Sequence, residues 1–249
     1  MLAHSALAIL LLGATAEAAI LPDNYILQKP LTSRRKLVLD IDGTLFPTET
    51  GLHQSLLNAI YNYTADKTRL PYPEAVTKAN QLYYSRGLVV RGLIEEFDIT
   101  GDDYEEYLAS HVDYSIVPFN QGLISLLERV DADLIVFTNS CRIHTMRVLS
   151  LLQVDQLLHM VVFADYRSKR FAVKPHDDAF AIVEELLGVP AEQIYFLDDR
   201  PDSIETAVKR NWNCLLIDET FAGETTAESR VARDISSLPI VFPDLMDPA

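Results

Sequence analysis

Two aspartates, Asp40 and Asp42, stand one residue apart at the end of an apolar run, in the stretch KLVLDIDGTLFPTE that begins at Lys36. In an extended backbone their side chains lie on the same face, so both can reach one bound group. A carboxylate can attack phosphorus and hold the phosphoryl group as an aspartyl phosphate, which makes Asp40 the candidate nucleophile. Asp42 could then reach the leaving oxygen, and we expect it to act first as general acid and afterwards as the base that activates water.

Three further polar clusters contain residue types that suit the same chemistry. The stretch FTNS places Thr138 and Asn139 after an apolar run, where the hydroxyl and the amide could bind phosphoryl oxygens. The stretch VKPHDDAF supplies Lys174, whose charge would stabilise the group in transfer. The stretch FLDDRPD supplies two more carboxylates, Asp198 and Asp199.

Aspartates that meet at one site repel one another, and a hard cation with oxygen ligands relieves that repulsion. We therefore predict a Mg²⁺ site formed by Asp198, Asp199, the carboxylate of Asp40 and the backbone carbonyl of Asp42. The ion would neutralise phosphate charge and fix the in-line geometry of the reaction.

Short apolar runs alternate with helical patterns over most of the chain, which predicts an α/β fold with a doubly wound parallel sheet. Buried strands are expected at Lys36–Ile41, Leu134–Thr138, Met160–Ala164, Ile194–Asp198 and Cys214–Asp218. Helices are expected at Gln121–Val130, Arg142–Leu152, Asp177–Leu187 and Ser203–Arg210. Functional groups gather outside the carboxyl ends of the strands in such sheets, so the four clusters should meet there.

From about Phe46 to Val117 the alternation stops and the pattern is helical throughout, which predicts a helical cap inserted after the first strand. The core would then comprise residues 36–46 and 118–249, and the cap residues 47–117. We expect the cap to close over the site and to determine specificity. Its candidates for substrate binding are Arg86 and Arg91, together with Tyr83 and Tyr84, although core packing is the first expectation for these two rings.

The chain carries 21 basic and 36 acidic residues and a formal net charge of -15, so its field repels polyanions and nucleic acid is not expected as a partner. A small phosphorylated substrate remains open, because a bound cation and nearby basic side chains reverse the potential locally. The basic run Thr32–Lys36 is interpreted as part of a solvated linker over residues 20–35. Cys141 and Cys214 form neither a zinc nor a disulfide pattern.

The N-terminus has an apolar stretch from about Ala6 to Ala16 followed by small residues. We interpret residues 1–19 as a secretory signal peptide cleaved after Ala18, with an uncleaved membrane anchor and a simple apolar helix as the alternatives. A cleaved leader implies the secretory pathway or the extracellular space. Stable membrane association is expected only if the leader is not cleaved.

The four clusters, DIDGT, Thr138, Lys174 and the pair Asp198 and Asp199, resemble the motifs of the haloacid dehalogenase-like (HAD) hydrolase superfamily over Lys36 to Asp218. The longer strings VFTNSCRIHTMRVLSLL, KPHDDAF, YFLDDRPDSIETA and YYSRGLVVRGLIEEFDI resemble the pyrimidine 5′-nucleotidase group of fungi and plants. The resemblance implies a Rossmann-like core and Mg²⁺-dependent hydrolysis of nucleoside 5′-monophosphates, chiefly UMP and CMP. Dehalogenases of the superfamily lack the second aspartate, so Asp42 favours phosphoryl transfer.

The sequence departs from that group in two respects. Ser203 stands where the family usually has Asn or Asp four residues after the metal aspartate, which implies weaker metal binding. The apolar leader is also unusual, because these enzymes usually work in the cytoplasm. The alternatives are a sugar-phosphate phosphatase or phosphomutase of the same superfamily, and a catalytically silent scaffold that binds a partner.

Overall fold

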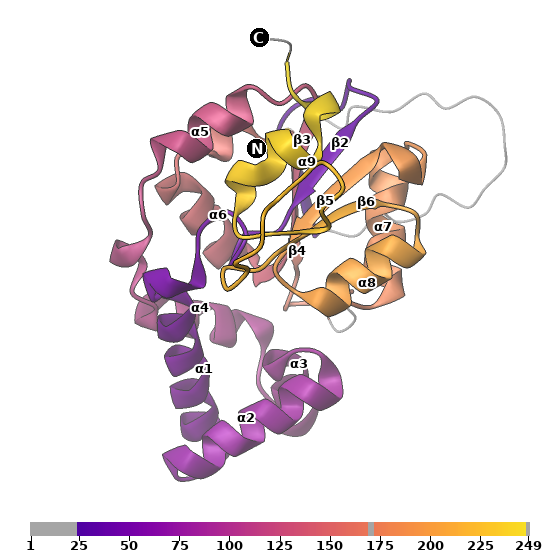
Figure 1. The fold of residues 1–249 in the computed structure, drawn as a ribbon. Helices are drawn as coiled ribbons and strands as arrows, with labels where there is room; N and C mark the ends of the chain where they lie inside the picture. The colour runs from indigo at the N-terminus through magenta and orange to yellow at the C-terminus, as the bar shows by residue number, and fades with distance from the viewer. Residues whose placement is uncertain (1–23, 169–171, 248–249) are drawn as a thin grey trace, which may run out of the picture.

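The computed structural model describes residues 24–168 and 172–247 and shows an α/β fold (Figure 1). Within these residues the strands form one seven-stranded sheet in the order β1-β4-β3-β2-β5-β6-β7. Only β1 runs antiparallel to its neighbour in this described sheet; the other pairs are parallel, which confirms the predicted doubly wound parallel architecture. The strands are β1 (Tyr25–Leu27), β2 (Lys36–Leu39), β3 (Asp133–Cys141), β4 (Met160–Ala164), β5 (Ile194–Asp198), β6 (Asn213–Ile217) and β7 (Val231–Ala232).

The segment interpreted as a linker contains an edge strand. β1 pairs with β4, and Tyr25 lies opposite Val162. Its three residues are too few to give a readable alternation, and their hydrogen bonds depend on a partner far along the chain. Lys36, at the end of the predicted solvated run, is buried and forms an ion pair of 2.5 Å with buried Asp133. The linker interpretation was therefore wrong at Tyr25–Leu27, and the solvated interpretation of the basic run was wrong at Lys36, which begins the predicted first strand.

Each face of the sheet packs on its own layer of helices, because alternate residues of a strand point to opposite faces. Leu37 and Leu39 belong to one buried cluster, whereas Val38 between them belongs to the other. The first cluster includes residues of α5 (Gln121–Glu128), α6 (Arg142–Leu151) and α9 (Leu238–Val241). The second includes residues of α7 (Asp177–Leu187) and α8 (Pro201–Lys209), which lie side by side in Figure 1.

A group of helices follows β2 and precedes β3, and Figure 1 shows it as a separate layer at the carboxyl end of the sheet. Gly87, with a φ of 80°, ends the second of these helices and donates its N–H to the carbonyl of Tyr83. Thr100 caps the fourth helix by accepting the N–H of Asp103 at 3.2 Å. The helices are α1 (Leu52–Thr68), α2 (Tyr72–Arg86), α3 (Val89–Glu96) and α4 (Gly101–His111).

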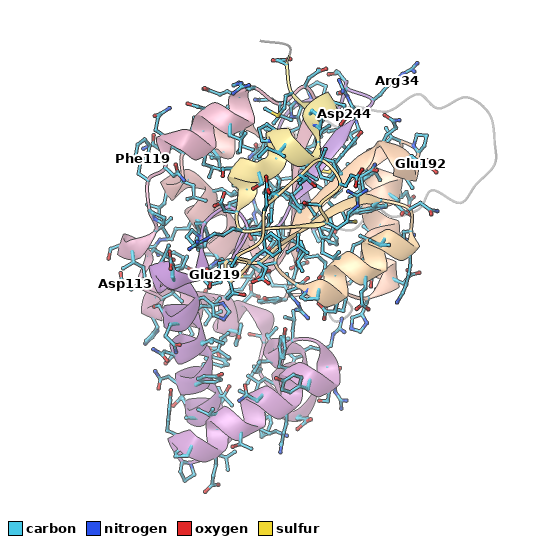
Figure 2. The ribbon with its side chains drawn as sticks, viewed as in Figure 1. Arg34, Asp113, Phe119, Glu192, Glu219 and Asp244 are labelled. Carbon is cyan, nitrogen blue, oxygen red and sulfur yellow. The ribbon has the colours of Figure 1, made fainter. Side chains whose placement is uncertain are left out.

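Both connections between this helical layer and the sheet are fixed by hydrogen bonds. On the first connection, the N–H of Thr48 donates to Glu219 at 3.0 Å, and Figure 2 shows Glu219 where the helical layer meets the core. On the second, the N–H of Asp113 donates to the hydroxyl of Ser55 at 2.8 Å. A Cβ on Gly101 would lie 2.0 Å from the carbonyl oxygen of Tyr166, so α4 begins in direct contact with the backbone that follows β4.

In the part of the chain that the structure describes, no helix has the length and apolarity to cross a membrane. The predicted leader, with its cleavage site after Ala18, lies outside the described residues.

Helix α4 buries a carboxyl group without a hydrogen bond to one of its oxygens. Glu105 is 3% exposed, and its Oε1 has no hydrogen-bond partner among the described residues. Burial raises the pKa of Glu105 to about 7; the charge of Arg167 opposes the shift and that of Asp165 adds to it. The protonated form is therefore favoured in the folded chain relative to the unfolded one.

We predict that Glu105 makes the protein less stable as pH rises. A folded-state pKa near 7, above the ordinary value of 4.5, contributes stability that is present at low pH and lost as pH rises towards 8. Glu105→Gln cannot ionise, so its free energy of unfolding relative to wild type should increase by up to about 3 kcal/mol between pH 5 and pH 8. Urea unfolding at the two pH values measures this difference. Glu106→Gln, an exposed neighbour, should show no such change, and an equal change in both variants would contradict the prediction.

Candidate active site

The four sequence clusters meet at the carboxyl edge of the sheet. Asp40 directly follows β2, Thr138 and Asn139 lie in β3, and Asp198 ends β5. Because β2 pairs with both β3 and β5, these groups lie on adjacent strands. The N–H of Asp40 donates to the carbonyl of Leu197 at 3.0 Å, which continues the ladder up to the two carboxylates.

Lys174 joins two of the carboxylates. Its Nζ donates to Asp40 Oδ1 at 2.8 Å, to Asp198 Oδ2 at 2.6 Å and to the carbonyl of Phe137 at 2.7 Å. The ammonium lies 5.1 and 5.5 Å from the ring centroids of Phe137 and Phe196, so its surroundings are otherwise apolar. Burial lowers the pKa of Lys174, but the charges of Asp198 and Asp40 outweigh burial and raise it. The lysine is therefore a fixed buried cation between two anions.

A third carboxylate completes an acidic cluster. Ligand oxygens of Asp40, Asp198 and Asp199 all lie within 4.8 Å of one another. Burial raises the pKa of Asp40; Lys174 lowers it, and the charges of Asp198 and Asp199 raise it further. Burial and the charge of Asp198 also raise the pKa of Asp199, to about 7. One lysine does not neutralise three carboxylates, and oxygen ligands at this spacing suit a hard divalent cation such as Mg²⁺.

The backbone leaves space for this cluster at Gly43. Its φ is 81°, a conformation that favours glycine, and a Cβ there would lie 2.6 Å from Oδ2 of Asp199. A side chain at Gly43 would therefore displace the third carboxylate. The neighbouring Thr44 does not fix the turn as residues of this type often do, because its buried hydroxyl has no hydrogen-bond partner among the described residues.

The carboxylate of Asp42 faces a different set of partners. Ser140 Oγ donates to Asp42 Oδ2 at 2.9 Å, and His144 Nε2 lies 3.1 Å from Asp42 Oδ1. Burial raises the pKa of Asp42, but the charge of His144 and the hydrogen bonds from His144 and Ser140 outweigh it and lower the pKa. The two aspartates of the DID stretch thus have opposite electrostatic surroundings.

Sequence patterns did not assign Ser140 or His144 a partner. His144 lies next to a motif along the chain, and that proximity was the one signal that could single it out among scattered histidines. Its ring is buried on the first turn of α6, and its Nδ1 lies 3.1 Å from the hydroxyl of Tyr114. Tyr114 belongs to the 3-10 turn η2 (Tyr114–Ile116), 30 residues earlier in the chain, and only the fold brings the two together.

Thr138 and Asn139 both lie at the site, and both have internal hydrogen bonds. Thr138 Oγ1 accepts the N–H of Ser140 at 3.0 Å. The side-chain amide of Asn139 donates to the carbonyl of Lys174 at 2.7 Å and accepts the N–H of Lys174 at 2.8 Å. These two bonds fix the backbone that carries the lysine. The Asn139 side chain thus holds Lys174 in this structure, and binding of substrate by the amide of Asn139 stays a prediction.

Two other residues singled out in the sequence are also buried here. Ser203 is fully buried in α8, and its Oγ lacks a hydrogen-bond partner among the described residues. Cys141 is buried, and burial raises the pKa of its thiol to about 12. A thiol of this kind is not a reactive nucleophile at neutral pH.

Arg86 and Arg91 line a cavity of about 810 Å³ between the helical layer and the core. Asp199 lines the same cavity, so the arginines and the acidic cluster open into one space. Arg86 Nε donates to Glu95 at 2.7 Å, and Arg91 donates to the carbonyl of Arg86 at 3.4 Å. Arg200 adds a further guanidinium at the cavity wall, 5.5 Å from the ring centroid of Tyr83.

Tyr83 and Tyr84 are not core aromatics. Tyr84 is 85% exposed, and both tyrosines line the cavity of about 810 Å³. They also line a second cavity of about 340 Å³ that extends to Asn139 and Ser140. The expectation of core packing was wrong because the helical periodicity of α2 does not show where this layer faces open space rather than another helix.

We predict that Mg²⁺ stabilises the folded protein through the acidic cluster. Addition of Mg²⁺ in excess of its Kd should raise Tm, because an ion that binds only the folded state stabilises it. Asp199→Asn should lose at least half of that increase and should raise Tm without metal, since one repelling charge is removed. Differential scanning calorimetry with and without Mg²⁺ measures both effects. Asp202→Asn, which removes an exposed carboxylate three residues further on, is the control, and a full Mg²⁺ effect in Asp199→Asn would contradict the assignment.

Comparison with known proteins agrees with this geometry. Residues 37–217 match the family described as haloacid dehalogenase-like hydrolase. An enolase-phosphatase E1 of Pectobacterium carotovorum is 28% identical over 72 residues, which cover 29% of this chain and 31% of that protein. Phosphate metabolism protein 8 of Saccharomyces cerevisiae is 25% identical over 199 residues, 73% of this chain and 61% of that protein.

The chain thus spans about a third and three fifths of the lengths of these two relatives. Among solved structures, the HAD-hydrolase YfnB of Bacillus subtilis, bound to magnesium, superposes with a TM-score of 0.53 at 15% identity, over 83% of this chain and 97% of YfnB. This likeness concerns the fold. With the family match over most of its length and the four motifs at one edge of its sheet, the chain belongs to the haloacid dehalogenase-like hydrolases.

Proposed function

We propose that this protein is a Mg²⁺-dependent phosphomonoester hydrolase that acts through an aspartyl phosphate on Asp40. The observation that carries the proposal is the contrast between two neighbouring carboxylates. Asp40 is bound to Lys174 within a cluster that suits a cation, whereas Asp42 is held apart from that cluster by Ser140 and His144. The arrangement provides a nucleophile and a separate acid and base on one short stretch of backbone.

The chain's own residues divide the reaction between them. Asp42 must carry a proton when the substrate is bound. A carboxylate oxygen of Asp40 attacks phosphorus as the bond to the leaving oxygen breaks, and Asp42 gives that oxygen its proton and becomes a carboxylate. A water molecule then attacks the aspartyl phosphate, Asp42 takes a proton from the water, and the phosphate leaves with the electron pair of the Asp40 carboxylate restored. Lys174 keeps Asp40 oriented and offsets negative charge in both steps.

The cation contributes charge neutralisation and alignment of the phosphoryl group when it is bound. Asp40, Asp198 and Asp199 would hold it, and we assign the backbone carbonyl of Asp42 as a further ligand. The raised pKa values of Asp40 and Asp199 support this assignment, because a divalent ion removes the repulsion that raises them.

Nucleoside 5′-monophosphates, with UMP and CMP first, are the substrates that we propose. The cavity of about 340 Å³ lies between the helical layer and Ser140, and the tyrosines and asparagine on its wall offer flat apolar faces together with an amide. Rings of this kind stack on nucleobases, and Asn80 can pair with a base edge. The resemblance of the motif strings to pyrimidine 5′-nucleotidases supports the same class. The wall includes His53, Tyr61, Asn80, Tyr83, Tyr84 and Tyr166.

We predict that Asp40→Asn lowers kcat by at least about 1,000-fold, because the amide cannot act as the nucleophile. The variant should fold, since it removes a charge from a crowded cluster. Phosphate release with Mg²⁺ from a panel of nucleoside monophosphates, sugar phosphates and p-nitrophenyl phosphate measures this effect. Asp178→Asn, an exposed substitution on α7, should retain wild-type activity.

The same panel tests the class of reaction. Preferred release of phosphate from UMP and CMP supports the nucleotidase, and broad hydrolysis supports a general phosphatase. Conversion of a sugar phosphate to an isomer without net phosphate release would favour a phosphomutase. If the wild-type protein released no phosphate from any ester, or if Asp40→Asn were fully active, the hydrolase mechanism would be wrong.

We also predict that Tyr84 contributes to binding of the base. Loss of one stacking ring costs about 1–3 kcal/mol, so Tyr84→Ala should raise the KM for UMP by about tenfold. The KM for p-nitrophenyl phosphate or glycerol phosphate should change less than about twofold, because these esters carry no nucleobase. Tyr72→Ala, which removes an exposed ring at the other end of α2, is the matched control. An equal rise in KM for all esters would exclude a role in base binding.

A further inference from the structure

Both oxygens of the Asp42 carboxylate are bound by side chains of one neighbouring segment. Ser140 at the end of β3 binds Oδ2, and His144 at the start of α6 binds Oδ1. The Asp42 side chain is 19% exposed, and His144 is 2% exposed. The carboxylate is therefore mostly shielded from solvent, and one of its two partners is fully buried.

Both ring nitrogens of His144 lie within hydrogen-bond distance of a polar group. Its Nδ1 lies 3.1 Å from the Tyr114 hydroxyl, and its Nε2 lies 3.1 Å from Asp42 Oδ1. A neutral imidazole has one donor and one acceptor nitrogen. If the tyrosine hydroxyl donates to Nδ1, then Nε2 carries the hydrogen and donates to the carboxylate. Burial raises the pKa of Tyr114, so its hydroxyl stays protonated and available as that donor.

Tyr114 is itself fixed between the helical layer and the core. The guanidinium carbon of Arg147 lies 4.1 Å from the centroid of the Tyr114 ring. The same arginine donates to the carbonyl of Ala109 in α4 at 3.0 Å. Buried polar atoms need hydrogen-bond partners, and the two nitrogens of His144 find theirs in polar groups of separate elements, Tyr114 and Asp42.

We propose that His144 is a positioning residue for the Asp42 carboxylate and that Tyr114 holds the His144 ring in the orientation that this requires. The inference rests on the proposed function, in which Asp42 protonates the leaving oxygen. It adds a buried chain, from Asp42 through His144 to Tyr114, that ties the acid and base to the segment joining the helical layer to the core.

The position of an acid matters in proportion to how much the leaving group needs a proton. A ribose or glycerol alkoxide needs protonation as it departs, whereas p-nitrophenolate departs without it. A displaced Asp42 should therefore slow formation of the aspartyl phosphate from alkyl phosphates and leave its formation from p-nitrophenyl phosphate nearly unaffected, whereas its role as base in the second step is common to all esters. General destabilisation of the fold, or loss of Mg²⁺, would slow both esters by the same factor.

The test compares the full chain with His144→Gln and Tyr114→Phe variants on UMP, glycerol phosphate and p-nitrophenyl phosphate at saturating Mg²⁺. His144→Gln should lower kcat/KM on the alkyl esters by about 10- to 100-fold, a part of what a general acid contributes, because kcat/KM reports the steps up to release of the leaving group. Tyr114→Phe should lower it by about 3- to 10-fold, because the histidine remains and loses one support. For both variants, kcat/KM on p-nitrophenyl phosphate should stay within about threefold of wild type.

His111→Gln is the matched control, because His111 is exposed and stacks on Tyr107, away from Asp42. Equal losses on alkyl and nitrophenyl esters, or no loss on either, would overturn the positioning role while the hydrolase assignment stood. A wild-type protein without phosphatase activity would overturn the proposed function and this inference with it. Circular dichroism establishes whether each variant folds. If His144→Gln does not fold, Tyr114→Phe alone tests the inference.

Discussion

The structure depends on accommodating several carboxylates around one buried ammonium. Two unit charges a few ångströms apart interact by several kcal/mol in a partly buried setting, so Asp40 and Asp198 could not lie together without Lys174 between them. Other features follow from this constraint. Asn139 fixes the backbone of the lysine with two hydrogen bonds, and Gly43 leaves space for Asp199 where a side chain would intrude.

The strand order explains why residues distant in sequence meet this constraint. β2 lies between β3 and β5, so the groups that end these strands come together without long loops. Lys174 reaches the same point from the segment before α7, a helix that packs on the face of the sheet opposite α5, α6 and α9. The rigid sheet sets the positions of the charged groups, and the adjoining helices supply the groups that hold them.

The site could be located from the sequence because its main residues lie at the ends of strands or just before a helix. There a charged side chain directly follows an apolar run or precedes a helical pattern. Asp40 and Asp198 close apolar runs, and Lys174 precedes a helix, so a parallel sheet alone brings them near one another. The contacts of Asn139, Ser140 and Tyr114 could not be predicted in the same way. Their partners are 30 or more residues away, and nothing local distinguishes a side chain that holds a backbone from one that binds substrate.

The same limit explains the edge strand and the exposed tyrosine. β1 exists because β4 offers hydrogen-bonding groups to it, and three residues have no period of their own. The position of Tyr84 agrees with the periodicity of an amphipathic helix, yet its ring lines two cavities and does not pack in the core. Propensity and periodicity describe a residue's own element, whereas exposure and hydrogen bonding depend on what the fold places opposite.

Insertion of the helical layer between β2 and β3 has a consequence for the acid and base. Both connections must leave and re-enter the core at the carboxyl edge, because that is where β2 ends and where the helices lie. The first connection contains Asp42, and the second contains Tyr114, which is joined to Asp42 through His144. A shift of the helices relative to the sheet would act on Tyr114 and Arg147, and so on the support of the Asp42 carboxylate. The topology that lets the helices cover a substrate therefore also places one of their connections against the residue that must protonate it.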